Sequence, residues 1–190
     1  MRSIRSAMIL VVLGASVCLA QITPVDDTPK EISTTARIAP EGEPGTPLVI
    51  SGTVYAQDGV TPVAGIIVYG YHTDKDGYYT PAHSFQQVPR LRGWAKTDAN
   101  GHFEFRTIRP APYPNRSIPA HVHWKVWGAG YPLQGPEELQ FSDDPFVTDA
   151  LRRQSAARGR FANIVMITRD SAGVQHCAVN LQVEHEPTNQ

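Results

Sequence analysis

His121 and His123 are separated by one residue in a run of apolar side chains. In an extended strand, residues two apart point to the same face, so both imidazoles are directed at one place. Tyr113 lies just upstream, in a turn that prolines make unsuitable for a regular strand. Imidazole nitrogen with phenolate oxygen suits a hard, oxidised ion such as Fe(III) better than zinc, which is usually held by Cys, His and carboxylate. The spacing therefore indicates a metal site.

A second phenol is available from the segment Gly77-Tyr78-Tyr79, which follows a turn. Tyr78 and Tyr79 are also typical of ordinary packing on a sheet surface, and His-x-His occurs on half-exposed strands without a metal. On the histidine strand, Val122 and its i+2 neighbours face away from the histidines, so the strand is expected to have an apolar core face.

Short strands separated by turn signals predict an all-β fold, a two-sheet antiparallel β-sandwich with long active-site loops and little helix. Asp-x-x-Gly sequences mark several of the turns, because glycine supplies positive φ. Two short stretches, 137–139 and 145–153, have a local helical pattern. Alternating or β-rich segments predict strands at 48–55, 63–71, 102–108, 120–127, 161–168 and 174–183.

The N-terminus is typical of an export signal covering residues 1–20. Arg2 and Arg5 precede an apolar run that ends in small residues near Ala20. A membrane anchor is the alternative, but the apolar run is short for a spanning helix. We therefore expect a secreted or periplasmic protein with no membrane association after cleavage of the signal.

The rest of the chain divides into a lead-in and one domain. Residues 21–46 are rich in Pro, Thr and acidic groups and lack a helical or strand period, which predicts a flexible N-terminal segment. Residues 47–190 have the length of one β-sandwich domain. The absence of a basic stripe argues against nucleic acid as a partner. Cys177 would be alone after signal cleavage, so we expect no disulfide within the chain and a buried thiol instead.

Several motifs along the domain resemble the intradiol ring-cleavage dioxygenases, the family of protocatechuate 3,4-dioxygenase and catechol 1,2-dioxygenase. They occur in the family's order and cover roughly Pro47 to Val183. The matching segments are Thr61-Pro-Val-Ala-Gly65, Tyr71-His-Thr-Asp-Lys-Asp-Gly-Tyr-Tyr79, Arg92-Gly-Trp-Ala-Lys-Thr-Asp-Ala-Asn-Gly-His-Phe-Glu-Phe105, Thr107-Ile-Arg-Pro-Ala-Pro-Tyr-Pro114, Pro119-Ala-His-Val-His123 and Phe141-Ser-Asp-Asp-Pro145.

The resemblance implies a mononuclear, non-haem Fe(III) bound by Tyr79, Tyr113, His121 and His123, with Tyr78 as the alternative first phenol. It also implies a catechol-type substrate, whose ring is cleaved between its two hydroxyls with O2 to give a muconate-type diacid. In this interpretation Tyr113 is displaced by the catechol and accepts one of its protons. The resemblance leaves a homo-oligomer open.

Two positions depart from the family pattern. Ile118 stands where the family has an arginine beside the substrate, so Arg116 is either its substitute in catalysis or a surface residue. Glu138 falls where the family has a glutamine, and a carboxylate there would disfavour an anionic substrate or pair with Arg116. The alternative function is a non-catalytic, transthyretin-like β-sandwich binding module, which shares the turn and strand motifs but needs no four-ligand set.

Overall fold

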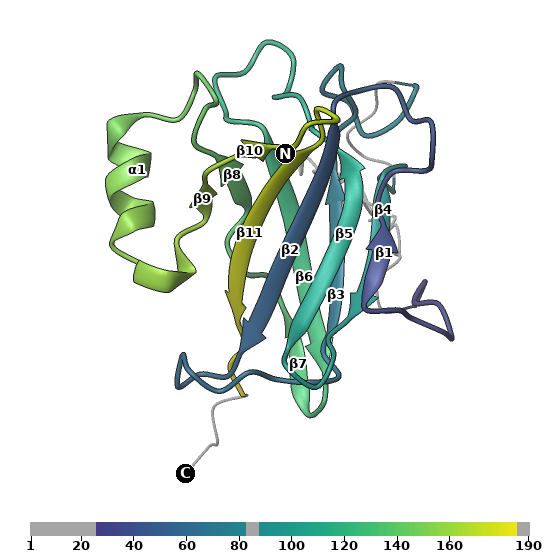
Figure 1. Ribbon diagram of the computed structural model, residues 1–190, viewed down its shortest axis with the longest axis vertical. Helices are drawn as coiled ribbons and strands as arrows, with labels where there is room; N and C mark the ends of the chain where they lie inside the picture. Colours follow the sequence, from purple (N-terminus) through teal and green to yellow (C-terminus); the bar gives the residue numbers. More distant parts are fainter. Residues whose placement is uncertain (1–25, 83–87, 186–190) are drawn as a thin grey trace, which may run out of the picture.

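The computed structural model describes residues 26–82 and 88–185, so the signal sequence expected at 1–20 lies outside the described residues. Two β-sheets pack face to face, and a short helix lies to one side of them (Figure 1). The all-β, two-layer fold expected from the sequence is therefore confirmed. In the described residues no helix combines the length and the apolar character needed to cross a membrane.

The first sheet has five strands in the order β1, β5, β2, β11 and β10. Their bounds are β1 Thr35–Arg37, β5 His102–Ile108, β2 Pro47–Tyr55, β11 Gln175–Gln182 and β10 Thr168–Arg169. The second sheet runs β4, β3, β6, β8 and β9, and β7 pairs with β6. Their bounds are β4 Arg92–Lys96, β3 Ile67–His72, β6 His121–Gly128, β8 Leu139–Phe141, β9 Ile164–Val165 and β7 Tyr131–Gln134.

The sheets are mixed, so the expectation of an antiparallel sandwich is wrong in this respect. β1 runs parallel to β5, β11 parallel to β2, and β8 parallel to β9. Each of these pairs joins segments that are far apart in sequence, with long connections that allow the chain to return in the same direction. Alternation along a strand reports which face is buried and says nothing of its neighbour's direction, which explains the error.

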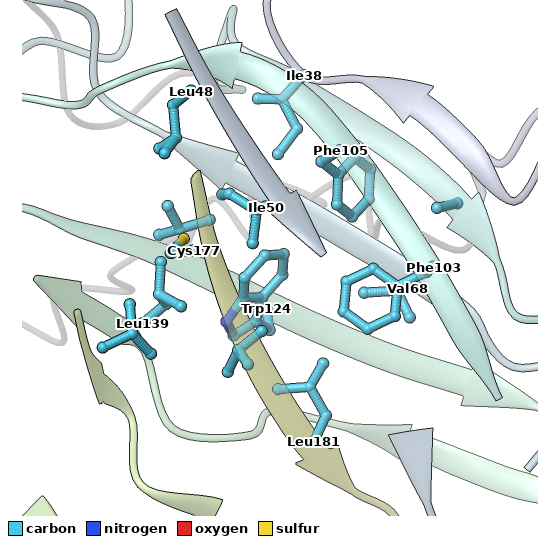
Figure 2. Packing of buried hydrophobic residues seen from close by; sticks show 14 of the residues in the cluster. Ile38, Leu48, Ile50, Val68, Phe103, Phe105, Trp124, Leu139, Cys177 and Leu181 are labelled. Carbon is cyan, nitrogen blue, oxygen red and sulfur yellow. The ribbon is translucent and has the colours of Figure 1, made fainter. Parts of the chain in front are cut away.

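The core lies between the sheets and is built from alternate residues of their strands. On β6, Val122, Trp124 and Val126 are almost completely buried, as the alternation predicted. Trp124 stacks on Phe105 of the opposite sheet, with ring centroids 6.0 Å apart (Figure 2). Cys177 on β11 is also buried in this cluster, and burial raises the pKa of its thiol to about 12. It is therefore an inert core residue, as expected.

Part of the N-terminal segment forms a strand, which its composition did not indicate. Residues 21–46 were expected to be flexible, yet Thr35–Arg37 form β1 and pair with β5. Ile38 and Ala39 are 3% and 2% exposed and belong to the core. A three-residue strand is too short to show a period, and the two apolar side chains that follow it belong to the core cluster. The expectation is corrected for this part of the segment.

The two helical predictions had different outcomes. The stretch 145–153 was expected to be helical, and the helix α1 begins inside it at Asp149 and continues to Ala156. The Thr148 side chain caps this helix by accepting a hydrogen bond from the Leu151 N–H. Residues 137–139 were expected to be helical, but Leu139 begins β8, which pairs with β6 and β9. The strand expected over 161–168 is also interrupted: a 3-10 helix at Gly159–Phe161 includes its first residue, and residues 166–167 separate β9 from β10.

Candidate metal centre

Three segments bring the predicted ligands to one end of the second sheet. Tyr79 lies in the loop after β3, Tyr113 in the loop between β5 and β6, and His121 and His123 at the beginning of β6. β3 and β6 are antiparallel neighbours with Tyr71 opposite His123, so the end of one strand adjoins the beginning of the other (Figure 1). The loops therefore meet the histidine strand at this edge.

Four donor atoms converge at this point. The Tyr79 hydroxyl lies 2.7 Å from His123 Nε2 and also contacts the Tyr113 hydroxyl. The Tyr113 hydroxyl lies 3.1 Å from His121 Nε2 and 3.2 Å from His123 Nε2, and the two Nε2 atoms are 3.1 Å apart. The structure thus brings Tyr79, Tyr113, His121 and His123 together as two phenol oxygens and two imidazole nitrogens with a common focus.

The loop that carries Tyr79 is built on an Asp-x-x-Gly turn that the chain uses three times, at 74–77, 98–101 and 170–173. In each turn the Asp side chain accepts two backbone N–H groups, at 2.8–3.0 Å. The glycine N–H donates to the Asp carbonyl, and the glycine has positive φ. This local pattern is specified by sequence alone, because only glycine adopts that φ without strain.

In the first of these turns, glycine also permits a close contact with the other tyrosine loop. A Cβ on Gly77 would lie 2.3 Å from the Pro112 carbonyl oxygen, immediately before Tyr113. The Thr73 hydroxyl donates to the Ala111 carbonyl at 2.7 Å, and the Ala111 N–H donates to the Asp74 carbonyl at 3.1 Å. These contacts fix the two phenols relative to one another.

Both histidines are oriented by their other ring nitrogen. His121 Nδ1 is 2.7 Å from the Pro119 carbonyl, which can only accept, so Nδ1 carries the proton and Nε2 has a free lone pair. His123 Nδ1 is 2.7 Å from a Glu138 carboxylate oxygen. Histidines that bind metals in proteins typically donate their second N–H to a carbonyl or carboxylate. The arrangement fits two neutral imidazoles that present Nε2 to a cation.

The electrostatics of the phenols also fit a cation. Burial and the contact with Tyr113 raise the pKa of Tyr79, and burial raises the pKa of Tyr113. Burial likewise lowers the pKa of His121. The protein by itself therefore keeps both phenols protonated and this imidazole neutral, and a bound cation would supply the charge that makes phenolates accessible.

The remaining predicted residues have different positions. Tyr79 is the tyrosine whose hydroxyl enters the cluster, whereas the Tyr78 backbone N–H closes the preceding turn. Arg116 is exposed, and its positive charge acts to lower the pKa of the Tyr113 phenol. Ile118 is also exposed. Glu138 contacts the histidines and forms no ion pair with Arg116 within the described residues.

Sequence reasoning missed two residues that support the site. Asp144 is buried, and its carboxylate accepts the Ala120 and Phe146 N–H groups at 2.9 Å, which anchors the residue before His121. Tyr71 stacks on His123, with ring centroids 4.5 Å apart and planes inclined by 15°. The Asp144-Pro145 dipeptide was visible as a motif, and Tyr71 is two residues beyond Tyr69 on β3, but neither contact follows from spacing.

The comparison with protein families identifies the family of the chain. A family model described as Dioxygenase matches residues 24–183, which is most of the chain. The chain belongs to the intradiol dioxygenase family. Among curated relatives, chlorocatechol 1,2-dioxygenase from Pseudomonas sp. (strain P51) is 31% identical in an alignment of 155 residues, and the match covers 73% of this chain. The chain spans 59% of the length of that relative.

Solved structures show the same fold. The 3-chlorocatechol 1,2-dioxygenase of Rhodococcus opacus 1CP aligns with a TM-score of 0.63 and 20% identity, covering 84% of this chain and 69% of that one. The dioxygenase domain of a dioxygenase carbohydrate-binding protein fusion from Streptomyces sp. SirexAA-E aligns with a TM-score of 0.60 and 22% identity. It covers 84% of this chain and 93% of that chain, so the sandwich described above corresponds to nearly the whole of that domain.

Proposed function

We propose that this protein is an Fe(III)-dependent intradiol dioxygenase that cleaves a catechol ring between its two hydroxyls with O2, giving a muconate-type diacid. The observation that carries the proposal is the convergence of two phenol oxygens and two imidazole nitrogens, all at the distances given above. Catechol 1,2-dioxygenase activity in the names of the relatives supports the same reaction class.

In this proposal Tyr79, Tyr113, His121 and His123 hold the iron. Hard oxygen donors with borderline imidazoles suit a ferric ion, and the anchored Nδ1 groups leave both Nε2 atoms available. When bound, ferric iron would supply a Lewis acid that draws electron density from the two oxygens of a catechol.

The protein's own residues then divide into fixed and movable groups. Tyr79 is 8% exposed and is held against His123, so it remains in place as a fixed donor. Tyr113 is more exposed and belongs to a proline-rich loop, which suits the phenol that yields its position to the substrate. With iron bound, the Tyr113 phenolate oxygen would accept a proton from the incoming catechol. Arg116, whose charge acts to lower the pKa of Tyr113, would favour the phenolate form before that proton transfer.

The test is to load the full chain with iron and record its visible spectrum before and after adding catechol. We expect a tyrosinate-to-iron charge-transfer band that shifts on catechol binding, followed by oxygen uptake and formation of a muconate. His123→Ala should abolish the band and the activity. His176→Ala is the matched control, because His176 is exposed on the other sheet and pairs with Asp170. A colourless protein after iron loading would contradict the proposal.

A non-catalytic binding module is the weaker candidate. Such a module needs the sandwich and its turns, and nothing in that role requires four oriented donors at one edge. If the protein were a binding module, His123→Ala would retain its ligand binding, whereas the iron enzyme would lose both metal and turnover.

We also propose that the protein is exported to the periplasm or secreted, on the basis of the basic and apolar residues at 1–20. Expression of the full chain in a bacterium, followed by fractionation and mass analysis of the mature N-terminus, tests this. Cleavage after Ala20 and recovery outside the cytoplasm are expected, and an uncleaved cytoplasmic protein would refute it.

A further inference from the structure

We propose that Glu138 makes this site selective for catechols whose ring substituent is uncharged or positively charged, against catechols that carry a carboxylate. The inference rests on the proposed function, because it concerns the molecule bound at the four-donor cluster. It assigns to Glu138 a role in choosing the substrate, beyond its contact with His123.

Glu138 lies beside the donor cluster itself. One carboxylate oxygen is 2.7 Å from His123 Nδ1, and the other is 3.9 Å from His121 Nε2, the nitrogen that contacts the Tyr113 hydroxyl. Ligand atoms of His121, His123 and Glu138 all lie within 4.8 Å of one another. A ring that reaches the focus of the four donors is therefore a close neighbour of this carboxylate.

Glu138 is also on the open side of the cluster. Its side chain is 42% exposed, against 5% for His121 and 19% for His123. The carboxylate is therefore in contact with solvent beside the more buried imidazoles. In this proposal the negative charge of Glu138 acts on the ring substituent of a catechol bound at the four donor atoms.

No described lysine or arginine neutralises this charge by an ion pair. The contacts of the Glu138 carboxylate are with the rings of His121 and His123. Arg116 acts on Tyr113 and does not pair with Glu138 within the described residues. The exposed side chain three residues before His121 is the apolar Ile118. A substrate carboxylate would consequently meet a like charge.

The size of the effect follows from charge separation. Two like charges roughly 7 Å apart at a partly exposed site disfavour binding by about tenfold, with solvent reducing the value expected for a buried pair. An uncharged substituent of the same shape avoids this repulsion, and an ammonium group is attracted instead. The site is therefore expected to discriminate by charge where shape is equal.

The experiment compares 3,4-dihydroxybenzoate with 3,4-dihydroxybenzamide, two catechols of nearly the same shape, on the iron-loaded full chain. Affinity is measured without oxygen from the shift of the visible band, and kcat/KM is measured by oxygen uptake. We expect the wild type to prefer the amide by about tenfold, and Glu138→Gln to reduce that preference to near unity. Dopamine should lose affinity in Glu138→Gln, because the attraction is removed.

Glu137→Gln is the matched control. Glu137 is the adjacent residue, its side chain is 51% exposed, and its carboxylate pairs with Arg158 at 2.9 Å instead of facing the histidines. The Glu137→Gln variant removes one negative charge at the adjacent residue and should retain the wild-type preference for the amide over the carboxylate. An unchanged preference in Glu138→Gln, or an equal change in Glu137→Gln, would overturn the inference.

A second measurement does not depend on the variant retaining iron. Raising the ionic strength should weaken the preference of the wild type for the amide, because salt screens exposed charges. A preference that is insensitive to salt would show that shape, not charge, selects the substrate. If the wild type binds both catechols without ring cleavage, the proposed function fails, while the affinity ratio still decides the role of Glu138.

Discussion

Gly77→Ala tests how the two phenols are held together. Gly77 has φ +87°, and a Cβ there would lie 2.3 Å from the Pro112 carbonyl oxygen and 2.9 Å from Pro114 Cδ. An L-residue in this conformation costs about 1–2 kcal/mol. The Tyr113 loop must in addition retreat by about 1 Å to restore an ordinary contact distance.

The expected consequences separate into stability and metal binding. The backbone term alone should lower Tm by about 2–8 °C for a chain of this size. The displacement of Pro112 moves the neighbouring Tyr113 away from Tyr79, which should weaken iron binding by about 10- to 100-fold, as for residues that orient metal ligands. Thermal unfolding of the metal-free protein and iron titration followed by the visible band measure the two effects separately.

The control is Gly173→Ala, in a turn with the same hydrogen bonds. Gly173 has φ +82°, and a Cβ at this position would meet nothing within 4 Å. This variant should lose similar stability and keep wild-type iron affinity. If Gly77→Ala binds iron as tightly as Gly173→Ala, the close contact between the two loops does not position the phenols.

Three further predictions concern the support of the site, its pH dependence and its ligands. Asp144→Ala removes two charge-assisted hydrogen bonds to backbone N–H groups and should lower the free energy of unfolding by about 3 kcal/mol. The control Asp143→Ala breaks only an ion pair with Arg109 and should lower it by less than about 1 kcal/mol. Urea denaturation measures both values. Burial lowers the pKa of His72 from 6.5 to about 4, so its neutral form stabilises the fold above pH 6.5. The free energy of unfolding of the metal-free protein should fall by about 3 kcal/mol as the pH falls from 6.5 towards 4. A similar pH dependence of this free energy in His72→Leu would refute the assignment. Tyr79→Phe should remove much of the visible band of the iron-loaded protein while Tyr78→Phe retains it, and the reverse result would assign the ligand to Tyr78.

The buried state of His72 itself illustrates what a sequence leaves open. Its Nδ1 lies 2.6 Å from the Thr73 carbonyl, and its Nε2 lies 2.6 Å from the Thr107 hydroxyl. The carbonyl can only accept, so Nδ1 carries the proton and the hydroxyl donates to Nε2, which is a fully paired neutral imidazole. Thr107 is on the opposite sheet, and the residues near His72 in the sequence do not predict this hydrogen bond.

Local chain geometry explains what the sequence determined by itself. The alternation on β6 placed Val122, Trp124 and Val126 in the core and aligned His121 with His123, because side chains of a strand alternate between faces. The Asp-x-x-Gly turns form as expected, because an Asp side chain and a glycine with positive φ satisfy the turn within five residues. The two-layer fold was predictable from the same alternation of short strands with turns.

Only the tertiary structure decided the contacts between distant segments. It brought the hydroxyl of Tyr79 to His123, placed Glu138 on the other nitrogen of that ring, and anchored the start of β6 through Asp144. It also set β1 parallel to β5 and β11 parallel to β2, against the expected antiparallel sandwich. These features depend on how separate strands and loops pack around one core, and the spacing of residues along a single strand carries no information about which partner will lie beside it.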